Sequence, residues 1–152
     1  MSDRLPLEFW RGVEEFNHQA FYECHDTLEA LWMEALDPEK RFYQGVLQIA
    51  VGCYHLSNHN WRGAVMLLGE GIRRLVDYTP AEYGVDVTKL VEQSNLLLKA
   101  LQSSGIEKVE SFSYLFNPAS ESSTTNSKNS TDAALINPES MVILPHISTV
   151  EC

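Results

Sequence analysis

The chain has 152 residues, of which 44% are hydrophobic and 21% charged, and its formal net charge is −10. This length and composition predict a single globular domain that can bury a core without disulfides or structural metals. The negative charge argues against a broad nucleic-acid-binding surface, because such a surface must neutralise phosphates. No run of the sequence approaches the roughly 20 apolar residues that span a bilayer.

The three cysteines, Cys24, Cys53 and Cys152, are neither even in number nor closely spaced, so they do not indicate a disulfide framework. The N-terminal residues lack the apolar core of a signal peptide. Both features fit a reducing compartment. We therefore expect a cytoplasmic protein that binds neither nucleic acid nor a membrane.

Residues 1–116 are predicted to form an all-α domain, a compact antiparallel bundle of about four helices. The predicted helices, each with apolar residues at helical spacing, are 7–36, 39–59, 61–77 and 87–103. Asp37-Pro38 ends the first helix, because the residue before a proline avoids the helical region. Asn60 and Asp86 are placed to cap the third and fourth helices, and Gly105 to stop the last one. No alternating pattern of a β-strand competes with this prediction.

Residues 117–152 are predicted to be a tail outside the bundle. The stretch 117–140 contains six Ser, three Thr and four Asn. Such a segment cannot bury enough apolar surface to offset the entropy of ordering it, so we expect it to be disordered. The following residues 141–150 (MVILPHISTV) are apolar again. Two interpretations are open for them: a loose tail, or a segment that docks on the bundle or on a partner.

Polar residues and a tryptophan share one face of the first predicted helix. At 100° per residue, Tyr22, His25, Glu29 and Trp32 all fall within about 40° of His18 on the helical wheel. Buried polar groups are costly unless they are paired. A polar stripe within an otherwise apolar pattern therefore requires a structural or functional reason.

The second predicted helix carries a matching polar stripe. Its polar members, which lie within about 60° of Arg41 on the wheel, are Gln44, Gln48, His55 and His59. Gly45 and Gly52 fall on the same side, and we expect them to let the first helix approach closely.

Two interpretations of these stripes remain open. In the first, Glu29 accepts hydrogen bonds from a histidine and a glutamine, and the network is structural. In the second, His25 and Glu29, at i and i+4, bind a divalent metal ion with His55 as a third ligand and an open fourth position. The residues expected to line the pocket around such a site are Tyr22, Glu23, Trp32, Arg41, Gln44, Gln48 and Asn60. If the protein is an enzyme, metal-assisted hydrolysis with Glu23 or Glu29 as general base fits this chemistry best.

The residues around His25-x-x-x-Glu29-x-x-Trp32 resemble a known signature. It is that of the bacterial and archaeal family called domain of unknown function 309. The further matching segments are Phe16-Asn17, Phe21-Tyr22-Glu23, Arg41-Phe42-Tyr43-Gln44-Gly45, Gln48-Ile49-Ala50, Tyr54-His55 and Asn60-x-x-Gly63-Ala64. The resemblance covers about residues 8–100. It implies an all-helical fold and a metal-binding role for the His and Glu of the signature, and it supplies no reaction.

The chain departs from the family pattern at two positions. Asp26 stands where the family often has Glu, and helical geometry points it away from the polar stripe. His59 stands where the family often has Gly, which argues against a glycine conformation at this junction.

A non-enzymatic interaction or structural module is the alternative function. Residues 47–80 form a predicted helical hairpin with small residues at its crossing, faintly like one tetratricopeptide unit. No second copy follows, and such repeats work in arrays of at least three. The acidic surface and the apolar segment 141–150 would still suit a protein partner or a homo-oligomer.

Overall fold

The computed structural model describes residues 5–116 and 142–150, and these residues are mainly helical. The elements in chain order are α1 (Leu7–Asn17), α2 (Phe21–Glu34), α3 (Glu39–Ser57), α4 (Trp61–Leu75), the 3-10 helix η1 (Val76–Tyr78), β1 (Ala81–Glu82), β2 (Val85–Asp86), α5 (Val87–Ser104) and the 3-10 helix η2 (Ile106–Phe116). The prediction of a helical domain is therefore confirmed, although the count of four helices is not. Within the described ranges, no helix is long and apolar enough to cross a membrane.

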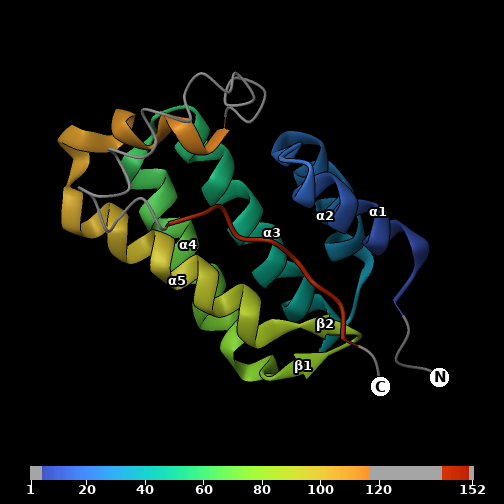
Figure 1. Ribbon diagram of the computed structural model, residues 1–152. Helices are drawn as coiled ribbons and strands as arrows, with labels where there is room; N and C mark the ends of the chain where they lie inside the picture. Colours follow the sequence, from blue (N-terminus) through green and yellow to red (C-terminus); the bar gives the residue numbers. More distant parts are fainter. Residues whose placement is uncertain (1–4, 117–141, 151–152) are drawn as a thin grey trace.

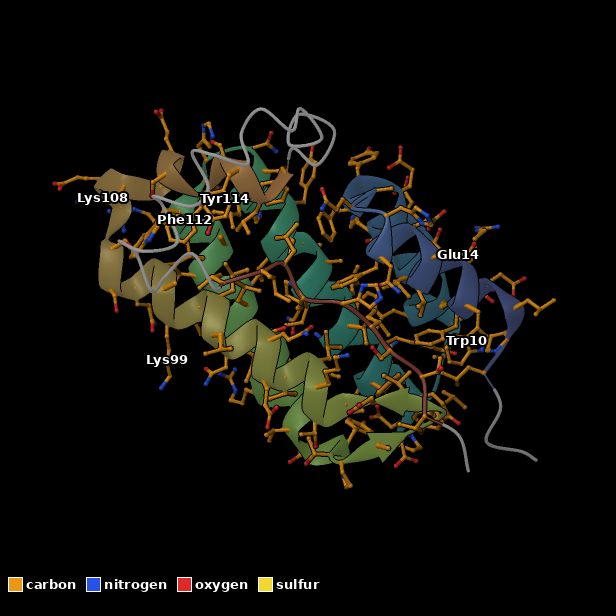
Figure 2. The ribbon with its side chains drawn as sticks, in the orientation of Figure 1. Trp10, Glu14, Lys99, Lys108, Phe112 and Tyr114 are labelled. Atoms are coloured by element: carbon orange, nitrogen blue, oxygen red, sulfur yellow. The ribbon has the colours of Figure 1, made fainter. Side chains whose placement is uncertain are left out.

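Helix α3 lies at the centre of the fold, between α2 on one side and α4 on the other (Figure 1). Helix α1 packs on α2, and α5 packs on α4, so that one core runs through all five helices. Side chains on the outer faces point away from this core, as Lys99 of α5 does in Figure 2. The largest fully buried side chains are Phe9, Phe16, Leu28, Phe42, Val46, Ile49, Leu56, Leu68, Leu75, Leu90, Leu97 and Leu101.

The predicted first helix, residues 7–36, is wrong as a single element, because the chain turns between α1 and α2. Gln19 adopts a left-handed conformation, with φ of 66°. The turn is closed by a hydrogen bond of 2.8 Å from the Ala20 amide to the Glu15 carbonyl oxygen. By folding back here, the chain brings the buried rings of Phe16 and Phe21 edge to face at 5.4 Å. The turn thus adds aromatic packing that one straight helix would not allow.

Three predicted helix ends are confirmed. The Asn60 side chain accepts from the Gly63 amide at 3.0 Å, and the Asp86 side chain accepts from the Lys89 amide at 3.0 Å. These bonds satisfy amides that have no partner within the helix. Gly105 follows α5 with φ of 84°, a conformation that glycine adopts without steric cost.

A short β-hairpin precedes α5, where no strand was expected. Strands β1 and β2 are antiparallel, with Ala81 opposite Asp86 and Glu82 opposite Val85. The two turn residues, Tyr83 and Gly84, have φ of 54° and 85°, which is the pattern of a two-residue type I′ turn. Val85 is fully buried, so the hairpin belongs to the core rather than to a surface loop.

The glycines of α3 do not face the first part of the chain, as the sequence analysis expected. A Cβ built at Gly45 would lie 2.7 Å from Leu75 Cγ, and one at Gly52 would lie 3.0 Å from Leu68 Cγ. Both leucines belong to α4. The glycines therefore allow α3 and α4 to approach closely. The prediction that this face of α3 contacts the first predicted helix is wrong.

The C-terminal segment, which we define as residues 142–150, runs as an extended chain between α1 and α5 and ends beside β2 (Figure 1). Its Ile147 is only 2% exposed and belongs to the core. The docking interpretation of this apolar stretch therefore agrees with the structure. The expected disorder of 117–140, like Cys152, falls outside the described residues.

Candidate metal centre

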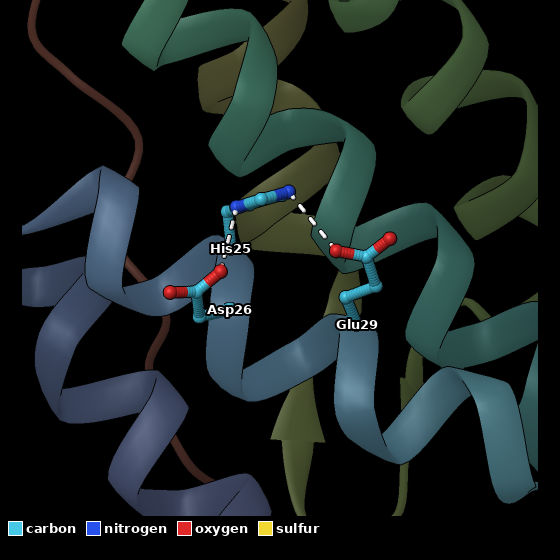
Figure 3. A group of neighbouring side chains, drawn as sticks. All are labelled: His25, Asp26 and Glu29. Atoms are coloured by element: carbon cyan, nitrogen blue, oxygen red, sulfur yellow. Dashed lines mark ion pairs between the residues drawn. The ribbon is translucent and has the colours of Figure 1, made fainter.

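Three side chains of types that can bind a metal ion gather on a partly exposed face of α2. One ligand atom each from His25, Asp26 and Glu29 lie within 4.8 Å of one another. The His25 Nε2 atom is 3.2 Å from Glu29 Oε1, and the His25 Nδ1 atom is 3.4 Å from Asp26 Oδ1 (Figure 3). The two carboxylates thus flank opposite edges of one imidazole ring.

The helix itself produces this arrangement. Residues four apart lie one above the other on a helix, which brings Glu29 next to His25. The group is open to solvent, since the side chains of His25 and Glu29 are 32% and 45% exposed. An ion could therefore reach it without a conformational change. Tyr22 lies one turn earlier, with its ring centroid 5.8 Å from that of His25 and 5.7 Å from that of Tyr54 on α3.

Asp26 is the residue of this group that the sequence analysis placed elsewhere. Its Cα follows that of His25 by 100° around the helix, which suggested that it pointed away. The Asp26 carboxylate nevertheless reaches the near edge of the imidazole. The signal that could have found it is the adjacency itself, because a carboxylate next to a histidine can contact the nitrogen that a metal leaves unused.

Trp32 continues the same face one turn after Glu29 and is covered by Lys40. The Lys40 ammonium lies 4.5 Å from the centroid of the Trp32 ring and donates a hydrogen bond of 2.7 Å to the Trp32 carbonyl oxygen. The indole Nε1 is buried and has no hydrogen-bond partner among the described residues. Lys40 thus closes the end of the α2 face through a cation–π contact and a helix-end hydrogen bond.

His55, the expected third ligand, is not part of the group. Its Nδ1 atom lies 3.2 Å from Asn60 Nδ2, at the junction of α3 and α4. A Cβ at Gly63 would lie 2.7 Å from the His55 ring, so the ring is packed against the start of α4. His55 and Asn60 therefore contact each other at this junction, and both lie outside the group on α2.

The polar residues of α3 interact with the opposite neighbour. Gln48 Oε1 accepts a hydrogen bond of 3.3 Å from Arg74 of α4, and Arg41 forms an exposed ion pair of 3.4 Å with Asp77 of η1. Gln44 is half-buried and Glu23 is exposed. The predicted pocket residues therefore separate into those on α2 and those that contact α4 and η1.

Glu70 organises the polar cluster on α4. Its carboxylate accepts from Arg73 at 2.7 Å and from Arg74 at 3.0 Å. The hydrogen bonds from Arg74 and Arg73 hold the pKa of the Glu70 carboxyl below its ordinary value. This cluster joins successive turns of one helix, and it pairs the Arg74 Nη1 atom with Glu70 and Gln48, whereas the buried Arg74 Nε has no hydrogen-bond partner among the described residues.

The thiols of Cys24 and Cys53 are buried in the core, where both residues pack as small apolar side chains. Burial and, to a smaller extent, the nearby Glu15 carboxylate together raise the pKa of Cys24 to about 12. Burial also raises the pKa of Cys53, with a smaller contribution from Cys24. Both residues therefore stay protonated at neutral pH and supply no thiolate ligand to the metal group.

Comparison with known proteins bears on this part of the chain. Residues 9–67 match the model of the family described as "Domain of unknown function (DUF309)". The chain is also 36% identical, over 85 residues, to the uncharacterized protein YpuF of Bacillus subtilis strain 168. That alignment covers 53% of this chain and 48% of YpuF, so the chain spans about half the length of the curated relative.

The match over residues 9–67 confirms the family resemblance found in the sequence. The match contains most of α1, all of α2 and α3 and the first part of α4, and with them the whole group on α2. Helix α5, η2 and the C-terminal segment lie beyond the match.

Proposed function

We propose that this protein binds a divalent transition-metal ion through His25 Nε2 and Glu29 on the outer face of α2. The observation that carries the proposal is the 3.2 Å separation of His25 Nε2 and Glu29 Oε1. Two atoms that bind one ion at about 2.1 Å and at tetrahedral angles lie about 3.4 Å apart. The pair therefore needs little movement to accept an ion.

Asp26 supports this assignment from the other edge of the ring. With Nε2 on the metal, the hydrogen of the neutral imidazole would reside on Nδ1, and Asp26 Oδ1 lies 3.4 Å from that atom. A carboxylate in this place fixes the tautomer and makes the imidazole a stronger ligand. The chemistry of the set, imidazole with carboxylate, favours zinc, manganese or iron over calcium.

The remaining coordination positions would be filled by water or by oxygen atoms of a ligand. Only two protein ligands converge on one side of the ring, and both are partly exposed. Such a site binds its ion less tightly than a closed structural zinc site. It leaves room for a small polar ligand, which fits a binding role as well as metal-assisted hydrolysis.

A structural ion pair is the competing explanation, and metal-dependent stability separates the two. The test uses the full chain without a histidine tag and follows thermal unfolding with zinc, manganese or iron(II), and with a chelator. At 100 times Kd, binding to the folded state adds about 2.7 kcal/mol. For a chain of this size, that corresponds to a rise in Tm of about 5–10 °C.

Glu29→Gln should remove the response to metal, because an amide oxygen is a poorer ligand for a divalent cation than a carboxylate. Glu23→Gln is the matched control, since Glu23 is an exposed carboxylate on the same helix outside the group. Asp26→Ala should weaken binding by about 10- to 100-fold without abolishing it. An equal response of Glu29→Gln and wild type would refute the assignment.

A further inference from the structure

The metal centre on α2 offers fewer protein ligands than zinc sites have. Zinc in proteins is held tetrahedrally, by four protein ligands in structural sites and by three in catalytic sites. Here His25 Nε2 and Glu29 Oε1 converge from one side, and both side chains are partly exposed. Among the described residues, only Asp26 joins this group, and it contacts the opposite edge of the imidazole ring (Figure 3). Two positions of a tetrahedral ion therefore stay open toward solvent.

Exposed apolar side chains flank the metal centre along the same face of α2. Tyr22 and Met33 are 53% and 65% exposed, although both are large and hydrophobic. At 100° per residue, His25, Asp26, Glu29 and Met33 all lie within about 60° of Tyr22 on the helical wheel. We call these five residues the α2 stripe. It presents metal-binding groups at its middle and an apolar side chain at each end.

The spacing of the α2 stripe is self-complementary. The midpoint between His25 and Glu29 is position 27, which lies five residues after Tyr22 and six before Met33. At 1.5 Å per residue, Tyr22 and Met33 are therefore about 7.5 and 9 Å from this midpoint, in opposite directions along the helix. If a second α2 lies antiparallel about a twofold axis through the ion, the partner's Met33 falls beside Tyr22. Contact between a methionine sulfur and an aromatic ring is favourable.

We propose that two copies of this chain share one zinc ion, each contributing His25 Nε2 and a Glu29 carboxylate oxygen, with their α2 stripes packed antiparallel. This inference rests on the proposed function, because the shared ion occupies the same site. A twofold axis through the ion makes its four ligands two equivalent pairs, which completes a tetrahedral zinc site. Each copy thus supplies the two donors that the other copy lacks.

Charge makes this pairing depend on the ion. Each chain carries a formal net charge of −10, and the carboxylates of Asp26 and Glu29 would face those of the partner. Like charges at short range repel, so chains without metal stay apart. One divalent ion balances the two Glu29 carboxylates of a pair. In zinc excess every chain binds an ion of its own, completed by water, and the pair separates.

Sedimentation equilibrium of the full-length, untagged protein tests the inference at increasing ratios of zinc to chain. Without zinc we expect the mass of a single chain, 17.2 kDa. The mass should rise toward twice this value as the ratio approaches one ion for two chains, and it should fall again in zinc excess. Chelator should restore the single chain from the dimer, and Glu29→Gln should remain a single chain throughout.

Met33→Gln tests the apolar end of the α2 stripe and leaves both ligands in place. The dimer would bury the new amide at two equivalent positions, so its dissociation constant should rise at least about tenfold. Met66→Gln is the matched control, because Met66 is 61% exposed on α4, outside the stripe. In zinc excess, both variants should bind as much zinc per chain as wild type.

The possible failures separate this inference from the proposed function. A protein that binds zinc in excess but keeps the mass of a single chain at every ratio would overturn the shared ion alone. A protein that binds no zinc would overturn both. The shared ion would also be refuted by a dimer of Glu29→Gln, by a dimer that persists in zinc excess, or by equal weakening in Met33→Gln and Met66→Gln.

Discussion

Gly71→Ala tests the close approach of α3 and α4, on which the core depends. A Cβ at Gly71 would lie 2.9 Å from the carbonyl oxygen of Gly45 and 2.8 Å from Ile49 Cδ1. The oxygen belongs to the backbone of α3 and cannot rotate away. The two helices would therefore have to separate, and the contacts on both sides of the crossing would loosen.

The magnitude follows from two opposing effects. Alanine is favoured over glycine inside a helix by up to about 1 kcal/mol. Overpacking a close contact costs about 1–3 kcal/mol. The expected net result for Gly71→Ala is a loss of about 1–2 kcal/mol of unfolding free energy. Gly69→Ala is the matched control on the same helix, because its Cβ would meet only Leu98 Cδ2 at 3.9 Å.

Urea unfolding measures both variants. The midpoint should fall for Gly71→Ala and rise for Gly69→Ala, with the slope m unchanged, since m reports the surface exposed on unfolding. A Gly71→Ala protein as stable as Gly69→Ala would refute the reasoning, because it would show that the helices can move apart at no cost.

Three further predictions concern the C-terminal segment, the α3–α4 junction and the buried thiols. Ile147→Ala should lower the free energy of unfolding by about 2–5 kcal/mol, whereas Ile143→Ala, at a position 52% exposed, should change it little; equal effects would show that the segment does not dock. His59 has φ of 61°, so His59→Gly should raise the free energy of unfolding by up to about 1 kcal/mol, less what is lost with the contact to Ser113. A lower melting temperature of His59→Gly in thermal unfolding would contradict this. In a Cys152→Ser chain, Cys24 and Cys53 should resist a thiol reagent at pH 8 until urea unfolds the protein, and rapid labelling of the folded chain would show that they are not buried. Because the pKa values of both thiols are raised in the folded state, unfolding free energy should decrease above about pH 8.5, where the unfolded chain loses its thiol protons first.

Geometry within one helix could be predicted from the sequence, and geometry between helices could not. His25 and Glu29 belong to the same helix, so their spacing alone places them together. The expected third ligand, His55, required knowing how α3 is rotated about its axis. That rotation is set by packing, since Gly45 and Gly52 turn toward the leucines of α4.

The turn between α1 and α2 was missed because no residue there signals it. Left-handed positions are usually glycine or asparagine, and here the position belongs to Gln19. His59 repeats the case at the α3–α4 junction: the sequence analysis argued against a glycine conformation there, and that interpretation is wrong, because His59 has φ of 61°. In both places tertiary contacts outweigh the local preference of the residue.

The short hairpin and the docking of the C-terminal segment could not be predicted from local sequence patterns, for a related reason. Strands of two residues are too short to show an alternating period. The order of the C-terminal segment depends on Asn17, 130 residues away in the sequence. The apolar composition of the segment left docking open as one interpretation, but its contacts with α1 and α5 are known only from the fold.

Direct measurement of bound metal tests the central claim most sharply. Wild-type protein without a tag would be stripped with chelator and dialysed to equilibrium against zinc, manganese or iron(II), and the bound metal would be counted per chain. We expect one ion per chain for at least one of these metals, with binding lost in Glu29→Gln and kept in Glu23→Gln and His55→Ala. Wild-type protein that retains no stoichiometric ion of any of the three, or a Glu29→Gln protein that retains as much as wild type, would contradict it.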